Sequence, residues 1–434
     1  MNTQSRLFEK AIFAKVAWRI LPLLFIVQLL GIVDRFNVGF AQLQMSADLG
    51  LSHAAYGLGA GLFFLGYFVF EVPSNMILAK VGARTWFTRI LVTWGAATIA
   101  MAYVTNEGWF YFLRFLVGAA EAGFAPGVQL YFSKWFPNAY RGRANGLFLM
   151  SIPFGGLIGG PLSGFILEHM TGLGGHNGWQ WIFLLEGAIT VAFAPIVFLF
   201  LPSEPKHAKW LDAEERAVID RSIIENGQGA RAHSLRDLTQ GHKVVLLSAT
   251  YFLLLLGNYG ISFWMPQIIK NSGISSASTI GWLAAIPALC TLVCMPLISR
   301  ASDIGGRKWF IVGGALLASS GLIVTSSYPT NTVLALVGLA MTSVGVLGVV
   351  PTFWAYVARS YVGAAATVGF ALINSIGNLA GFVAPYYMGV VADTTGSPAG
   401  GGYAIAIAGL CAALLAVLFF EGSQQPHHAV AGKN

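Results

Sequence analysis

Four charged residues lie inside apolar stretches of the first half of the chain: the neighbours Asp34 and Arg35, and Arg114 with Glu121. A charged residue at the centre of a membrane helix costs roughly 2.5–3.5 kcal/mol on insertion scales, so such residues are first considered as parts of ion or substrate pathways. Arginine stays charged and presents a planar fork of donors that matches a carboxylate. The pattern therefore indicates a pathway for an anion.

The two acidic residues suit a second task, which is to take up a proton on one side of a membrane and release it on the other. Removal from water favours the protonated carboxyl group and a nearby arginine opposes this, so an anion that arrives at the arginine shifts the balance. We expect Asp34 and Glu121 to be proton-coupling residues and Arg35 and Arg114 to bind the anion. The competing interpretation is that Asp34–Arg35 and Arg114–Glu121 are structural ion pairs, although residues 114 and 121 lie two helical turns apart, roughly 10 Å along the axis.

The stretches that position these residues are long enough to cross a bilayer. Of the 434 residues 56% are hydrophobic and 10% charged, whereas soluble domains are about one-quarter charged. Apolar stretches of about twenty residues match a hydrocarbon core of roughly 30 Å. We predict an all-α membrane protein with twelve transmembrane helices, at residues 18–43, 54–79, 86–105, 108–133, 143–167, 179–201, 243–266, 277–299, 308–326, 331–354, 364–391 and 402–420.

The formal charge of +7 is explained by topology rather than by a nucleic-acid partner. If the N-terminus is cytoplasmic, the basic residues outside the spans fall on the cytoplasmic side, except Lys270. Arg35 and Arg114 remain at membrane depth. An even number of spans then places both termini in the cytoplasm, and the lipid bilayer is the first partner that we expect.

A long polar segment divides the spans six and six. We predict an N-terminal six-helix bundle at 1–201, a cytoplasmic linker at 202–242 and a C-terminal six-helix bundle with a cytoplasmic tail at 243–434. Within the linker, Asp212 is placed to cap a short amphipathic helix. The halves show a weak repeat at an offset of 224 residues, as in pseudo-symmetric transporter folds. At this offset Asp34 aligns with Asn258 and Glu121 with Gly345, so the charged chemistry belongs to the first half.

Twelve spans in two related halves, together with the loop sequence DIGGRK at residues 303–308, resemble the major facilitator superfamily. The segments LGIVDRFN (30–37), GYFVFEVPSN (66–75), RFLVGAAEAG (114–123) and NSIGNLAG (374–381) resemble its anion:cation symporter family. This resemblance implies import of sugar acids, tartrate-like hydroxy acids or aromatic acids with protons, and the roles given above to the four charged residues. The chain departs from the superfamily at Ala79, where the first cytoplasmic loop usually carries aspartate.

Other residues suit supporting roles. Amides and aromatic residues orient polar ligands, and six of them lie in the predicted spans as candidate substrate-binding residues, although packing between helices is an equal alternative for each: Tyr67, Asn258, Tyr259, Trp354, Asn374 and Asn378. We expect four residues near the loop signature to gate the cytoplasmic side as a latch, the alternative being an ordinary basic loop: Arg84, Asp303, Arg307 and Lys308. Glu71 and Glu186 lie nearer the ends of spans, and we expect structural roles for both.

We therefore expect a multi-pass transporter of a bacterial inner membrane, monomeric, that imports a small organic anion by proton symport through alternating access. The alternatives are an organic anion exchanger or uniporter on the same fold, and, more distantly, a membrane receptor or an enzyme. The sequence has no spacing typical of a zinc site and no nucleophile, phosphate or cofactor motif, so we expect protons as the coupling ion, no cofactor and no catalytic residues.

Overall fold

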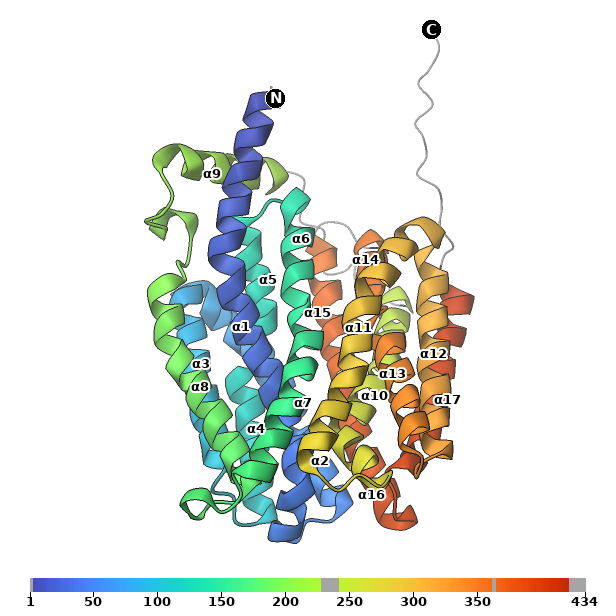
Figure 1. The fold of residues 1–434 in the computed structure, drawn as a ribbon. Helices are drawn as coiled ribbons and strands as arrows, with labels where there is room; N and C mark the ends of the chain where they lie inside the picture. The colour runs from blue at the N-terminus through green and yellow to red at the C-terminus, as the bar shows by residue number, and fades with distance from the viewer. Residues whose placement is uncertain (1–2, 228–241, 361–363, 421–434) are drawn as a thin grey trace.

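The computed structural model describes residues 3–227, 242–360 and 364–420. The secondary structure of these residues consists of helices joined by short loops. The first half forms one bundle (Figure 1). Its helices are α1 (Thr3–Leu49), α2 (His53–Val81), α3 (Ala83–Met101), α4 (Glu107–Glu121), α5 (Phe124–Trp135), α6 (Asn138–Leu149), α7 (Ser151–His169) and α8 (Gly178–Phe200), with a short 3-10 helix η1 (Leu173–Gly175).

The second half forms a second bundle beside the first, and the linker lies over the end of the first bundle that carries the N-terminus (Figure 1). The linker contains η2 (Pro205–His207) and α9 (Ala213–Gly227). The second bundle consists of α10 (His242–Asn271), α11 (Ala277–Gly305), α12 (Arg307–Ser327), α13 (Thr332–Leu347), α14 (Val350–Ser360), α15 (Ala364–Asn378), α16 (Ala380–Thr395) and α17 (Ala399–Phe419). The tail at 421–434 and linker residues 228–241 lie outside the described residues.

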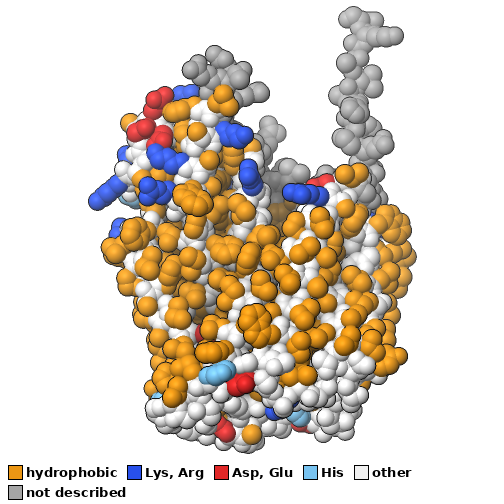
Figure 2. Space-filling model, viewed as in Figure 1, with side chains coloured by type: hydrophobic (Ala, Val, Ile, Leu, Met, Phe, Trp, Pro, Cys, Tyr) orange, Lys and Arg blue, Asp and Glu red, His pale blue; other side chains and the backbone are white. Residues whose placement is uncertain are grey.

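The all-α membrane fold predicted from the sequence is confirmed. Within the described residues, nine helical segments are long and apolar enough to cross a membrane. The other three predicted spans correspond to α3 and to two helix pairs, α4 with α5 and α15 with α16. Figure 2 shows apolar side chains around the middle of the molecule and Lys and Arg side chains gathered toward the end that carries the N-terminus, called the basic end below.

The span predicted at 108–133 is interrupted in the structure. Helix α4 ends at Glu121 and α5 begins at Phe124, because Gly123 between them has φ +86°, a left-handed conformation that glycine adopts without strain. The Ser74 hydroxyl donates to the Ala122 carbonyl at 2.7 Å and would lie 2.3 Å from a Cβ at position 123. The break leaves Glu121 at a helix end in the interior of the bundle.

The two halves contact each other closely at the end opposite the basic end. The Asp393 carboxylate on α16 accepts hydrogen bonds from the backbone N–H groups of His53 and Ala54 at the start of α2, both at 2.9 Å. The Glu168 carboxylate on α7 accepts hydrogen bonds at the start of α11, from the Ser276 hydroxyl and the Ser278 N–H, both at 2.7 Å. Each half thus caps a helix of the other, since a carboxylate satisfies the free N–H groups and the positive dipole of a helix N-terminus.

These two caps are related by the internal repeat. Helices α2 and α11 begin at His53 and Ala277, which are 224 residues apart (277 − 53), the offset found in the sequence. A glycine also lets α2 approach α16 of the other half closely, since a Cβ at Gly57 would lie 2.3 Å from the Pro385 carbonyl oxygen. The carboxylate caps and the close packing at Gly57 therefore close this end of the molecule.

The short helix predicted in the linker is present as α9. Asp212 accepts from the Glu215 N–H at 2.8 Å and Glu215 accepts from the Asp212 N–H at 3.0 Å, which is a reciprocal capping box. Glu215 also forms an ion pair with Lys15 on α1 at 2.7 Å. The linker helix is therefore fastened to the first bundle.

Candidate functional site

Helix α1 directs Asp34 and Arg35 to different neighbours, because adjacent residues of an α-helix are about 100° apart around its axis. Arg35 forms an ion pair with Glu121 at the end of α4. Asp34 accepts instead from the Trp94 indole N–H on α3 at 2.8 Å. The structure thus shows one ion pair between α1 and α4, Arg35 with Glu121. It does not show the two structural pairs considered from the sequence, Asp34–Arg35 and Arg114–Glu121.

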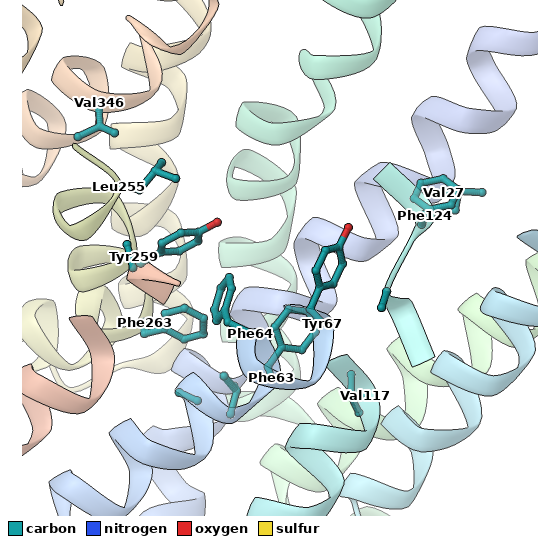
Figure 3. Packing of buried hydrophobic residues seen from close by; sticks show 14 of the residues in the cluster. Val27, Phe63, Phe64, Tyr67, Val117, Phe124, Leu255, Tyr259, Phe263 and Val346 are labelled. Atoms are coloured by element: carbon teal, nitrogen blue, oxygen red, sulfur yellow. The ribbon is translucent and has the colours of Figure 1, made fainter. Parts of the chain in front are cut away.

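The Arg35 guanidinium lies among aromatic rings. Its central carbon is 5.1 Å from the ring centroid of Phe63, 5.8 Å from Phe64 and 5.5 Å from Tyr67, which are distances of cation–π contact. Tyr259 on α10 also interacts electrostatically with Arg35. Figure 3 shows Phe64 and Tyr67 on one side and Tyr259 and Phe263 on the other, facing each other across the boundary between the halves.

Arg114 is 1% exposed and lies beside the same ring. Its guanidinium carbon is 5.1 Å from the Phe63 centroid, and one terminal nitrogen donates to the Ala60 carbonyl at 3.4 Å. Its Nε atom meets no acceptor among the described residues. Arg114 is thus a buried cation with an unpaired Nε donor, and it lies within electrostatic reach of Asp34 and Glu121.

Glu121 also keeps an oxygen to spare. Its Oε2 atom has no hydrogen-bond partner among the described residues, while Oε1 accepts from Arg35. The carboxyl group lies against Gly31 of α1, where a Cβ would lie 3.5 Å from Oε1, an ordinary van der Waals contact. The site therefore combines two guanidinium groups with a carboxyl group whose partner can change.

Asp34 belongs to a second polar cluster on another side of α1. The Asn37 side-chain amide, one turn further along, lies 3.5 Å from Asp34 and donates to Glu186 on α8 at 2.6 Å. Asp34 is 2% exposed and Glu186 5%. Two carboxyl groups thus share one amide in the interior of the first bundle.

The second half contributes polar groups and no charge to these clusters, within the described residues. The Tyr259 hydroxyl donates to the Asn378 side chain at 2.8 Å. Trp354 lies farther from Arg35, in edge contact with Tyr251 at 5.2 Å, and Tyr251 in turn interacts with Tyr259. Asn374 lies beside Glu71 of the first half. Of the candidate substrate-binding residues, Tyr67, Tyr259 and Asn378 therefore lie with Arg35.

Asn258 lines a cavity of about 90 Å³ between the halves, away from the Arg35–Glu121 pair. The cavity is bordered by α1 residues Val33, Phe36 and Asn37 and by Ser163 of α7. These α1 residues lie on a different face from Arg35. The molecule therefore has the arginine site on one face of α1 and this mostly apolar cavity on another.

The four candidate gating residues bind within their own halves. Asp303 and Arg307 form an ion pair one turn apart on the basic end, and Lys308 donates to the Val417 carbonyl at 2.8 Å. Arg84 donates to the Phe198 carbonyl and lies 4.3 Å from the Phe198 ring. The predicted latch between the halves is not engaged in this structure.

The sequence reasoning did not assign Asn37, Trp94, Tyr251 or Glu186 to a site. Glu186 could have been considered for a site, because it is an ionisable residue inside a span. Its position near the end of that span favoured a structural role instead. Asn37 and Trp94, the partners of Asp34, gave no sequence signal for a site, since asparagine and tryptophan are common in membrane helices. Glu71, also expected to be structural, lies 3.5 Å from the Ser375 hydroxyl of the other half.

Two bundles with charged residues buried in the interior are an arrangement found in membrane transporters. The sequence model of the Major Facilitator Superfamily matches residues 24–276 and 247–434. The chain belongs to this superfamily and is a multi-pass membrane transporter.

Several bacterial transporters are similar to the chain over nearly its whole length. "Putative metabolite transport protein NicT" of Pseudomonas putida is 44% identical, covering 89% of this chain and 90% of its own. "Putative tartrate transporter" of Agrobacterium vitis is 42% identical, covering 96% and 92%. "Quinolone resistance transporter" of Acinetobacter baumannii is 39% identical, covering 95% and 96%.

Among solved structures, the xylose transporter XylE from E. coli in an inward open conformation matches with a TM-score of 0.75. The match covers 94% of this chain and 98% of that one, at 14% identity. At this identity the likeness establishes the fold alone.

Proposed function

We propose that this protein imports a small organic anion together with protons, by alternating access of the two halves. The observation that carries the proposal is the ion pair of Arg35 with Glu121, next to the unpaired Nε donor of Arg114. An incoming carboxylate meets two guanidinium groups that each have an unpaired Nε donor, and one of them is already paired with a carboxylate of the protein.

This arrangement links anion binding to protonation. A substrate carboxylate that takes the place of Glu121 on Arg35 leaves the Glu121 carboxyl group buried without its partner. A buried carboxylate without a cation is costly, and the group lowers that cost by binding a proton. Anion and proton therefore bind with positive coupling, which is the requirement for symport.

The surroundings of Arg35 suit a hydroxylated or aromatic carboxylate. Tyr67, Tyr259 and Asn378 offer hydroxyl and amide groups to a sugar acid or a hydroxy acid, and Phe63 and Phe64 offer ring faces to an aromatic acid. The name of the Agrobacterium vitis relative supports tartrate as the first compound to test.

The proposed orientation places the basic end in the cytoplasm of a bacterial inner membrane, with both termini on that side and the molecule acting as a monomer. Excess Lys and Arg mark cytoplasmic loops in membrane proteins. The end fastened by Asp393 and Glu168 is then periplasmic and closed, and the open latch at the basic end fits a cytoplasm-facing state.

The proposal is tested with purified protein in proteoliposomes that are acidic outside and neutral inside. Labelled tartrate is added first, then a labelled sugar acid and labelled phthalate. Accumulation above equilibrium that a protonophore abolishes supports proton symport. Counterflow of a compound that the proton gradient does not accumulate identifies an exchanger or uniporter and contradicts the proposal.

A further inference from the structure

Glu186 stands out among the buried acidic residues of the first bundle because none of the arginines in the described residues interacts with it. Glu121 is paired with Arg35, and Asp34 interacts with both arginines. The groups that act on Glu186 are Asp34, Asn37 and Ser163, of which Asp34 alone is charged. Its Oε1 atom meets no donor in good hydrogen-bond geometry among the described residues.

The helices packed against Glu186 supply no other charge from the described residues. Helix α1 presents Asp34 and Asn37, α3 presents Trp94 and Thr98 beside Asp34, and α7 presents the Ser163 hydroxyl. Two adjacent carboxylates without a cation in contact repel each other in a medium of low dielectric constant. The pair is therefore most stable with one proton shared between the two groups.

The position of the pair also connects it to the cavity. Asn37 and Ser163 both border Glu186 and both line the cavity on the face of α1 away from Arg35. The cavity of about 90 Å³ has room for water, and the Asn37 and Ser163 side chains are polar partners for it within a mostly apolar lining. Glu186 is thus reachable from the cavity without passing the anion site.

We propose that Glu186 is a third proton-coupling residue, which holds a proton drawn from the cavity and passes it to Asp34, so that protons and the anion reach α1 from different faces. In the transfer the O–H bond at Glu186 breaks, an O–H bond forms at Asp34, and the negative charge moves to Glu186. The Asn37 amide lies between the two carboxyl groups, 2.6 Å from Glu186 and 3.5 Å from Asp34. The role rests on the proposed proton symport.

The proton on Glu186 is tested without substrate, by infrared spectroscopy of the purified protein near neutral pH. The wild-type protein should show the carbonyl band of a buried carboxylic acid, and Glu186→Gln should lose it. Glu214→Gln, on the exposed linker helix α9, should keep it. If Glu186→Gln does not fold, Glu186→Asp decides the question, since a shorter acid in the same place should move the band. A band unchanged in these Glu186 variants overturns the proposal.

The relay is tested by transport of the compound that the wild-type protein accumulates. Glu186→Gln should lose at least about tenfold in proton-driven accumulation while keeping counterflow within about twofold, the pattern of a step outside the anion site. Accumulation at the wild-type rate in Glu186→Gln overturns the relay even where symport holds. If the wild-type protein takes up no protons, the proposed function fails, and the infrared band still tells whether Glu186 carries a proton.

Discussion

Arg35 of α1 pairs with Glu121 of α4, although Asp34 is its neighbour in the chain and Arg114 is the cation on the helix of Glu121. The pair crosses between two helices and lies under the rings of Phe63, Phe64 and Tyr67. In the proposed function, a substrate anion competes with Glu121 for Arg35 at this place.

Removing the charge of Glu121 should separate binding from coupling. In Glu121→Gln the Arg35 fork loses its internal carboxylate, so the substrate competes with a neutral amide and binds at least as well as in the wild-type protein. Proton-driven accumulation should fall to the level reached with a protonophore, while counterflow persists. Labelled uptake in proteoliposomes measures both, with Glu214→Gln as the control. Loss of counterflow together with accumulation would make Glu121 a structural partner of Arg35.

The two arginines should be needed for binding itself. Hydrogen bonds to charged groups contribute about 1.5–3 kcal/mol, and 1.4 kcal/mol is tenfold in affinity, so Arg35→Ala and Arg114→Ala should each weaken substrate binding roughly 10- to 100-fold. Arg35→Lys keeps the charge and loses the fork, and it should bind with intermediate affinity. Isothermal titration of purified protein with the substrate gives these affinities.

The matched control for the arginines is Arg89→Ala, because Arg89 contacts the Trp86 ring at the basic end and lies away from the site. Its affinity should stay within about twofold of wild type, the range of a substitution that removes no substrate contact. Equal weakening in Arg89→Ala, or wild-type affinity in both arginine variants, would remove Arg35 and Arg114 from the anion site.

The caps between the halves should control which end is open. In the double variant Asp393→Asn, Glu168→Gln the starts of α2 and α11 lose their carboxylate partners, so the end opposite the basic end should open more often. Hydrogen–deuterium exchange at residues 52–56 and 276–280 should become faster than in the wild-type protein. Glu107→Gln is the control, since Glu107 bonds Tyr111 within its own helix. Unchanged exchange would show that glycine packing alone closes this end.

The close approach at Gly57 should also be required for closure. A Cβ at this position would meet the Pro385 carbonyl oxygen at 2.3 Å, and overpacking of this kind costs about 1–3 kcal/mol. Gly57→Ala should therefore shift the protein away from the state with this end closed and slow transport, without touching a substrate contact. Gly313→Ala on α12, where a Cβ would meet no heavy atom within 4 Å, should transport at the wild-type rate. Equal rates in both variants would contradict the argument.

The sequence predicted the fold more completely than the partners of each residue. Span length, the basic end and the repeat offset follow from hydropathy and spacing, which a single sequence contains. How each helix is rotated against its neighbours decides which partners a side chain meets. This rotation pairs Arg35 with Glu121, and Asp34 with Trp94 and Asn37. The break at Gly123 depends on Ser74 of another helix, and so it was not visible in the apolar stretch at 108–133.

The central claim is that an anion and a proton enter together, and external pH measures this most directly. Proteoliposomes in a lightly buffered suspension receive in turn sugar acids, tartrate-like acids, dicarboxylates and aromatic acids. We predict that one class of acid makes the external medium alkaline and that added protonophore abolishes this rise in pH. The variants Asp34→Asn and Glu121→Gln should show no rise. Labelled counterflow of one of these acids with no change in external pH would contradict the account and identify an exchanger or uniporter.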